Sequence, residues 1–268
     1  MFYVKTSLIP REIAVGHFTD GTLKIKCPIS RLAGKKLDAH IIWHYEKEEE
    51  LSTLIQLTLH LRDHGIQDII LDMPYLPNAR QDRVQSEEEV FTLKHFAKVI
   101  NWLNFTCVNV LDVHSRVSLA LFDRIVNRSP QPYIDEAMKR IGTNVATFFP
   151  DEGAMKRYSN SHEYPAAFGM KTRNPETNKV ESLVLTGDTS HIKGNDVLII
   201  DDICGKGETA LRCAKALKNA GANKVYLFVS HCENTVIGSE LLESDLVEHI
   251  FTTPGLFNQI HKKITVIA

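Results

Sequence analysis

Short runs of apolar and β-branched residues recur along the chain, and between them apolar residues return every three or four positions. The runs are typical of buried strands, and the intervening pattern is typical of amphipathic helices. Strands are predicted at residues 39–45, 68–73, 105–113, 144–149, 196–200 and 224–229, and helices at 51–64, 87–103, 134–141 and 208–220. This alternation predicts an α/β fold with mostly parallel sheets flanked by helices.

Local signals sharpen these predictions. Residues 69–71 and 197–200 are uninterrupted apolar runs, so both strands are expected to be buried on both faces of a sheet. Ser86 and Glu89 have the spacing of a capping box at the start of the second helix. Gly221 follows the last helix, where glycine commonly ends a helix.

The length of 268 residues fits two domains of ordinary size. Residues 127–132 form a turn-rich interruption, so we expect one domain at 1–128 and a second at 129–268. Residues 171–181 are polar and predict an exposed loop between two short strands.

Composition argues against several classes of protein. The net charge of −2 gives no indication of a surface that binds nucleic acid. The five scattered cysteines form no CxxC pair, which favours reduced thiols in the cytoplasm. The first ten residues lack the apolar run of a signal peptide, and no stretch approaches the roughly 18 apolar residues of a transmembrane helix.

The strongest chemical signal follows the strand at 196–200. Asp201 and Asp202 end this strand, and a turn then opens the next helix through Gly205, Lys206, Gly207, Glu208 and Thr209. Ligands of open α/β sheets bind at the carboxyl ends of strands, and free amides at a helix N-terminus suit a phosphate. The segment predicts a sugar phosphate site, with hydroxyls on the aspartates and the 5-phosphate on the turn. The alternative is that Asp202 only caps the strand and the glycines only make the turn.

The residues after the strand at 68–73 are polar and include Arg80, Gln81, Asp82 and Arg83. The guanidinium group of arginine can donate two hydrogen bonds to the oxygens of one phosphate, so this segment is a candidate nucleotide site. Taken alone, it could equally be a solvated surface.

Three other places carry candidate residues. His114 follows Asp112 at a strand end and is either a cation or phosphate ligand or a structural histidine. Asp151 lies where a strand meets a helix and could hold Mg²⁺ through oxygen or could cap the helix. Lys171 and Arg173 begin the polar loop, where two cations could stabilise charge that develops on phosphates.

In this order, the segments resemble the ribose-phosphate pyrophosphokinase family, also called phosphoribosyl pyrophosphate synthetases. The most specific match is the Pro-Tyr-x-x-x-Ala-Arg-Gln-Asp-Arg run at 74–83. The segments at 112–114 and 150–153 are similar to the family's Asp-Leu-His and Pro-Asp-x-Gly motifs. Lys171 and Arg173 match its Lys-x-Arg pair, and 201–209 resembles its phosphoribosyl-binding loop. Residues 18–21 match part of a Phe-Ser-Asp-Gly-Glu element.

The resemblance implies two phosphoribosyltransferase-like domains, the first for ATP and the second for ribose 5-phosphate. The implied ATP contacts are Phe18, Asp20, Arg80, Gln81, Asp82 and His114. Mg²⁺ would be served by His114 and Asp151, and catalysis by Lys171 and Arg173. The implied ribose 5-phosphate contacts are Asp201, Asp202, Gly205, Lys206, Gly207, Glu208 and Thr209. In the family, the element at 18–22 reaches the ATP site of a neighbouring subunit, which implies a homo-oligomer, either dimer or hexamer, with a shared ATP site.

The phosphate loop departs from the family pattern Asp-Asp-x-x-Asp-Thr-Gly-Gly-Thr. Its third aspartate, first threonine and second glycine are replaced by Gly205, Lys206 and Glu208. Lys206 could offer a cation to the 5-phosphate, whereas Glu208 would repel it unless turned outward. Residues 87–89 and 231–233 also differ where the family forms its allosteric site, so weak or absent allosteric control is predicted.

Two other functions fit parts of the pattern. A phosphoribosyltransferase would share the 201–209 segment but would not need the 74–83 run or the Lys-x-Arg pair. A non-catalytic regulatory relative that binds nucleotide and a synthetase partner would tolerate the altered loop. The presence of His114, Asp151, Lys171 and Arg173 argues against it.

Overall fold

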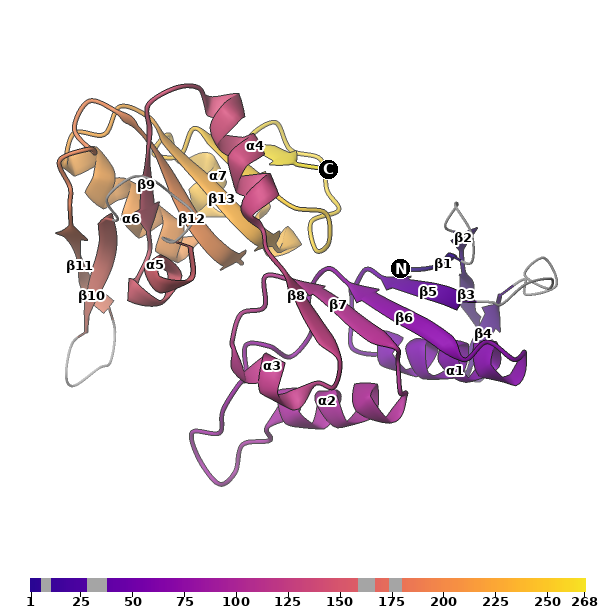
Figure 1. Cartoon of the computed structure of the whole chain (residues 1–268). Coiled ribbons are helices and arrows are strands. Elements are labelled where there is room, and N and C mark those ends of the chain that lie inside the picture. The colour runs from indigo at the N-terminus through magenta and orange to yellow at the C-terminus, as the bar shows by residue number, and fades with distance from the viewer. Residues whose placement is uncertain (6–10, 28–37, 159–166, 174–179) are drawn as a thin grey trace. The chain divides into compact units, whose positions relative to one another are not determined.

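The computed structural model describes residues 1–5, 11–27, 38–158, 167–173 and 180–268, with the backbone alone at 11, 171–173 and 180–182. The chain divides into two compact units, Met1–Arg128 and Ser129–Ala268. Each unit is built around its own sheet (Figure 1).

Unit 1 contains a six-stranded sheet in the order β2-β1-β5-β6-β7-β8. Its strands are β1 (Phe2–Lys5), β2 (Arg11–Glu12), β5 (Asp38–Trp43), β6 (Asp68–Met73), β7 (Cys107–Leu111) and β8 (Ile125–Arg128). β5 to β8 run parallel, whereas β1 is antiparallel to both of its neighbours. A separate antiparallel hairpin is formed by β3 (Ala14–His17) and β4 (Leu23–Lys26). The helices of unit 1 are α1 (Glu50–Asp63), α2 (Thr92–Trp102) and α3 (Val117–Leu121).

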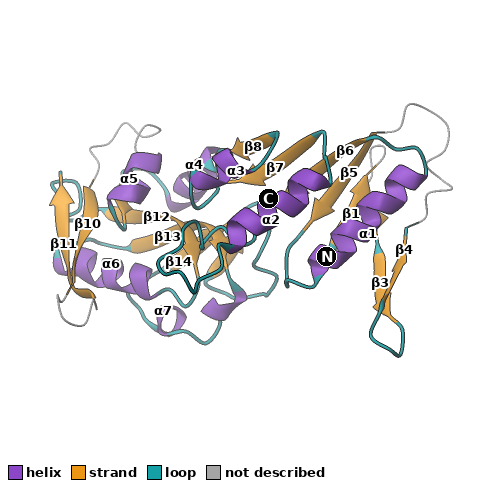
Figure 2. Ribbon diagram, turned by 90° about the horizontal axis from the view of Figure 1, so that it is seen from below, coloured by secondary structure: helices purple, strands orange, loops and turns teal. Residues whose placement is uncertain are grey.

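The core of unit 1 lies on one face of its sheet, where α1 and α2 pack (Figures 1 and 2). Alternate residues of β6 point into this core, so Ile69 and Leu71 are fully buried while Ile70 between them is only half-buried. The prediction that 69–71 is buried on both faces is therefore wrong. An apolar run does not show whether a second layer of helices covers the far face of the strand.

Unit 2 contains a seven-stranded sheet in the order β11-β10-β9-β12-β13-β14-β15. Its strands are β9 (Val145–Phe149), β10 (Ala167–Arg173), β11 (Val180–Gly187), β12 (Asp196–Cys204), β13 (Val225–Cys232), β14 (His249–Thr252) and β15 (Ile264–Val266). The strands are parallel except for β11, which pairs with β10 in an antiparallel hairpin. The helices are α4 (Gln131–Ile141), α5 (Glu152–Tyr158), α6 (Glu208–Asn219), α7 (Glu240–Glu243) and a 3₁₀ turn at Asn234–Val236.

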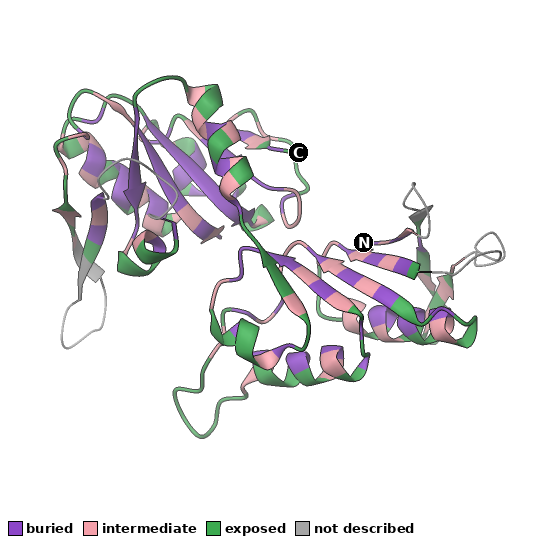
Figure 3. Ribbon diagram, in the orientation of Figure 1, coloured by how far each residue is buried: buried purple, intermediate pink, exposed green. Residues whose placement is uncertain are grey.

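Helices cover both faces of the unit 2 sheet. Side chains of α6 pack with Val197 and Ile199 on one face, while α4 and α5 pack with Leu198 and Ile200 on the other. All four of these β12 residues are fully buried, and β13 is buried along its whole length (Figure 3). The prediction of a strand buried on both faces is confirmed for 197–200, and the predicted α/β class with mostly parallel sheets is confirmed for the chain.

Several predicted boundaries move. The second helix begins at Thr92 rather than at 87, and no side chain caps it, so the capping box is wrong. Glu89 instead accepts a hydrogen bond from the backbone of Gln85 at 2.8 Å, within the turn that precedes the helix. β12 runs on to Cys204, so Asp201 lies inside the strand, paired in register with Val229. Gly221 does end α6 as predicted, with a positive φ of 91° that glycine tolerates. No helix in the described ranges is both long and apolar enough to cross a membrane.

Candidate functional site

The carboxyl ends of three neighbouring parallel strands carry the polar residues of unit 2. β9, β12 and β13 are hydrogen-bonded side by side, so their ends meet at one edge of the sheet. Asp151 follows β9, Asp202 lies near the end of β12, and Glu233 follows β13. Parallel open sheets bind ligands at this edge, so the polar residues lie where a ligand is expected.

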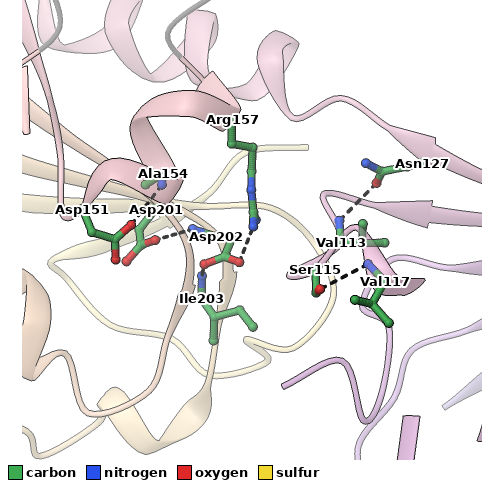
Figure 4. A network of polar contacts seen from close by, with 10 residues as sticks. All are labelled: Val113, Ser115, Val117, Asn127, Asp151, Ala154, Arg157, Asp201, Asp202 and Ile203. Atoms are coloured by element: carbon green, nitrogen blue, oxygen red, sulfur yellow. Dashed lines mark hydrogen bonds and ion pairs between the residues drawn. The ribbon is translucent and has the colours of Figure 1, made fainter. Parts of the chain in front are cut away.

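Asp151 and Arg157 are both positioned by α5. The carboxylate of Asp151 accepts a hydrogen bond from the backbone of Ala154 at 3.0 Å, which caps the first turn of α5. Two turns along the same helix, the guanidinium of Arg157 donates to Asp202 at 2.7 Å (Figure 4). The Asp202 side chain is 10% exposed and that of Arg157 is 31% exposed, so the ion pair is largely shielded from water.

Asp201 and Asp202 are held differently. Asp202 accepts hydrogen bonds from Arg157 and from the backbone of Ile203, at 2.9 Å, so both of its oxygens are engaged. Asp201 accepts a hydrogen bond from the backbone of Asp202 at 3.0 Å (Figure 4). Burial, and secondarily the neighbouring charge of Asp202, raises the pKa of Asp201 well above its usual range. The two carboxylates thus differ in their surroundings: Asp202 is paired with an arginine, whereas the pKa of Asp201 is raised.

The turn from Gly205 to Thr209 requires glycine at its centre. Gly207 has a φ of 79°, and a Cβ at this position would lie 2.3 Å from the Leu241 side chain. Gly207 is also the N-cap of α6, which no side chain caps, so the first amides of the helix can meet a ligand. Glu208 is 77% exposed and lies 3.8 Å from Arg212, so it turns outward rather than over the turn.

In unit 1 the segments at 80–83 and 112–115 come together around Asp82. Asp82 accepts hydrogen bonds from Arg83, at 2.8 Å, and from the hydroxyl of Ser115. The Arg83 hydrogen bond is the main cause that lowers the pKa of Asp82, and the Ser115 hydrogen bond also lowers it. Arg80 is exposed, whereas Asp82 is mostly shielded.

Gln81 and Asp112 are tied to the framework of unit 1. The hydroxyl of Thr92, the first residue of α2, donates to the Gln81 side chain at 2.9 Å. Asp112 is buried after the end of β7 and has a φ of 43°, which is uncommon for a residue with a side chain. Residues held in this region cluster at functional sites.

The element at 18–22 is the tip of the β3–β4 hairpin. The carboxylate of Asp20 accepts hydrogen bonds from the backbone, at 3.0 Å, and the hydroxyl, at 2.7 Å, of Thr22. These bonds lower the pKa of Asp20. Phe18 is exposed, with the ammonium of Lys24 at 5.3 Å from the centre of its ring. An exposed aromatic on a tight turn is free to meet another surface.

Lys171 and Arg173 end β10, next to residues 174–179, which lie outside the described part of the chain. Their side chains also lie outside it, so the structure does not test their predicted role. Arg157 and Glu233 are two residues to which the sequence assigned no site role. The signal for Arg157 was its position on the helix that follows Asp151. Glu233 belongs to the 231–233 segment, which the sequence marked only as a departure from the family's allosteric site.

No cluster of three or more histidine, cysteine, aspartate or glutamate side chains suited to a metal occurs within the described ranges. This does not conflict with Mg²⁺, because Mg²⁺ in phosphate sites is commonly held by one or two carboxylates together with substrate phosphates.

Comparison with known proteins gives concordant matches. A family model described as a phosphoribosyl transferase domain matches residues 166–251. The ribose-phosphate pyrophosphokinase of Thermococcus kodakarensis is 26% identical over 225 residues, or 82% of this chain and 77% of that protein. Ribose-phosphate pyrophosphokinase 1 of Listeria monocytogenes is 27% identical over 251 residues, or 91% of this chain and 77% of that protein.

The fold agrees with these sequence matches. The crystal structure of phosphoribosylpyrophosphate synthetase from Mycobacterium smegmatis matches with a TM-score of 0.75 at 20% identity. The match covers 96% of this chain and 85% of that one. The sequence matches bear out the resemblance to the ribose-phosphate pyrophosphokinases, and the structural match shows that this chain shares its fold with a phosphoribosylpyrophosphate synthetase.

Proposed function

We propose that this chain transfers the β,γ-diphosphate of Mg-ATP to the 1-hydroxyl of ribose 5-phosphate, giving phosphoribosyl pyrophosphate and AMP. The observation that carries the proposal is the edge of the unit 2 sheet. There, two aspartates lie in the last four residues of β12, one of them paired with Arg157, and the strand leads into a helix N-terminus that no side chain caps. This arrangement suits a molecule with vicinal hydroxyls at one end and a phosphate at the other.

Ribose 5-phosphate would bind with its phosphate on the turn. The amides of Glu208 and Thr209, at the start of α6, would donate to the phosphate oxygens, and Lys206 would add a cation. Gly205 and Gly207 have no side chain, so the backbone of the turn can approach the phosphate closely. Asp202, held by Arg157, would accept a hydrogen bond from one ribose hydroxyl. Asp201, next to it in the strand, would accept a hydrogen bond from the second ribose hydroxyl.

ATP would bind to unit 1. Arg80 is exposed, and its guanidinium would donate to phosphate oxygens, while Gln81 and Asp82 are held in place by Thr92 and by Ser115. Phe18 and Asp20 would serve the ATP site of a neighbouring subunit, which makes the chain a homo-oligomer. The dimer and the hexamer both satisfy this requirement.

His114 and Asp151 are the residues that would serve Mg²⁺. When bound, Mg²⁺ neutralises charge on the phosphates and orients them. The oxygen donors of Asp151 suit this hard cation, and the other ligands would be substrate oxygens and water. Because phosphoryl transfer requires little covalent chemistry from the protein, positioning and charge stabilisation would supply most of the rate.

Lys171 and Arg173 would stabilise the charge that develops as AMP leaves. Lys171→Ala should therefore lower turnover by orders of magnitude with little change in ATP affinity. Lys224→Ala is the matched control, because Lys224 is an exposed lysine that pairs with Glu248 at 3.2 Å, at the opposite end of the sheet. Equal turnover in the Lys171→Ala variant and the unmodified protein would remove this residue from the mechanism.

The test is an AMP-release assay with ATP, Mg²⁺ and ribose 5-phosphate, run with and without inorganic phosphate. AMP formed in equal amount to phosphoribosyl pyrophosphate, without any nucleobase, supports the proposal. Consumption of phosphoribosyl pyrophosphate only when a nucleobase is present would identify a phosphoribosyltransferase instead. ATP binding without AMP release would favour the non-catalytic relative. The same assay tests the expected weak response to phosphate, and the cytoplasmic location stays a prediction.

A further inference from the structure

The carboxylate of Glu233 lies against the turn that would receive the acceptor's phosphate. A Cβ built on Gly205 would lie 3.2 Å from a carboxylate oxygen of Glu233. Gly205 is the first residue of that turn, so a negative charge lies beside it before any ligand binds. The position comes from the register of the sheet, in which Cys204 pairs with Cys232 and the chain leaves both strands at the same level.

Hydrogen bonds from the backbone and from a neighbouring side chain hold Glu233 in this place. Its backbone amide donates to the carbonyl of Cys204 at 2.8 Å, which ties the end of β13 to the end of β12. The hydroxyl of Thr235 donates to the carboxylate at 2.9 Å, on the oxygen that approaches Gly205. The side chain is half-buried, which weakens the screening of its charge by water.

We propose that Glu233 is a specificity-determining residue that weakens the binding of a phosphate dianion to the turn. A phosphate on this turn would lie close to the Glu233 carboxylate, and two negative groups at such a distance repel each other. The outward-turned Glu208 does not contribute in the same way, because it is solvated and lies near Arg212. The inference rests on the proposed acceptor site but not on catalysis, so it can be measured by binding alone.

Glu233→Gln is the informative variant. Glutamine keeps the shape of the side chain, can accept the Thr235 hydrogen bond and removes the negative charge. We expect affinity for inorganic phosphate and for ribose 5-phosphate, measured by calorimetry at low salt, to rise about fivefold or more. The gain should shrink at high salt, which a purely structural effect would not do. The KM for ribose 5-phosphate should fall by more than kcat changes.

Two matched variants separate position from net charge. Glu248→Gln removes the same charge at the opposite end of the sheet, where Glu248 pairs with Lys224, and should leave phosphate affinity unchanged. Thr235→Val keeps the Glu233 charge but releases its oxygen, and should raise affinity by less than Glu233→Gln. Unchanged or weaker phosphate binding in Glu233→Gln, or an equal gain in Glu248→Gln, would overturn the proposal.

The outcome is distinct from that of the AMP-release assay. If AMP never forms but Glu233→Gln binds inorganic phosphate more tightly, the proposed function fails and the role of Glu233 stands. If AMP forms and Glu233→Gln shows no gain in binding, the role of Glu233 fails and the proposed function stands.

Discussion

Replacing Arg157 with methionine would leave the Asp202 carboxylate without the guanidinium that it contacts at 2.7 Å. Methionine keeps much of the aliphatic stem, so the change removes mainly the charge and the hydrogen bond. Unit 2 should lose stability, because the shielded Asp202 carboxylate would no longer face the positive charge of Arg157. The effect should concentrate on β12 and α5, the two elements that the ion pair joins.

The magnitude follows from geometry and exposure. Two unit charges 2.7 Å apart attract by about 6 kcal/mol at an effective dielectric constant of about 20. Desolvation offsets part of this attraction, and removing one partner of a buried pair costs about 3 to 5 kcal/mol. Because Arg157 is 31% exposed and Asp202 keeps the Ile203 amide, we expect about 2 to 3 kcal/mol less unfolding free energy.

Hydrogen exchange read by mass spectrometry is the suitable assay, because it resolves the two units. Peptides from β12 and α5 should exchange faster in the Arg157→Met variant. Trp43 and Trp102, the only two tryptophans, both lie in unit 1, so unfolding followed by tryptophan fluorescence serves as the control.

A double-mutant cycle isolates the pair itself. Arg157→Met and Asp202→Asn, singly and together, should give a coupling energy of about 2 kcal/mol in unit 2. A coupling energy below about 0.5 kcal/mol would refute the reasoning, since it would mean that the contact is worth no more than an exposed surface ion pair.

Three further predictions concern neighbouring residues. The pKa of Asp201 is raised in the folded state, so the free energy of unfolding should fall as pH rises above the ordinary aspartate pKa of 3.8. Asp201→Asn should remove this loss. In urea unfolding, the free energy that the variant gains over the unmodified protein should therefore grow from pH 4 to pH 7. An advantage independent of pH would contradict the titration. Gly207→Ala should lower the free energy of unfolding by about 2 kcal/mol or more and abolish phosphate binding, because the new methyl group would clash with Leu241. Gly194→Ala is the control: Gly194 has the same φ of 79°, but no atom lies where the methyl group would go. This variant should lose only about 1 kcal/mol. Equal losses would exclude the steric clash. The pKa of Asp82 is lowered in the folded state, so its contribution to the free energy of unfolding is present at neutral pH and is lost as pH falls through the folded pKa. Asp82→Asn should make the stability of unit 1 less sensitive to acid, as followed by tryptophan fluorescence. The same acid titration in the variant and the unmodified protein would contradict this prediction.

The sequence by itself determined the α/β class and the places where chemistry would lie. The run at 197–200 is apolar at every position and predicted a buried strand, which β12 is, although the similar run at 69–71 leaves Ile70 half-buried. Gly221 marked the end of α6 because a positive φ favours glycine. These features are local, since each depends on residues within a few positions. The capping-box prediction at Ser86 and Glu89 is wrong because Glu89 accepts a hydrogen bond from the Gln85 backbone instead, and the helix begins later, at Thr92.

Only the tertiary structure decided how the polar residues are used. The Arg157–Asp202 pair joins residues 45 positions apart, and Asp82 meets Ser115 from another strand end. Gly207 excludes a side chain because of Leu241. Each contact depends on which strands are neighbours and on their register, which the alternation of strands and helices does not encode. The sequence marked 231–233 only as a departure from the family, and Glu233 lies beside the turn because β13 pairs with β12.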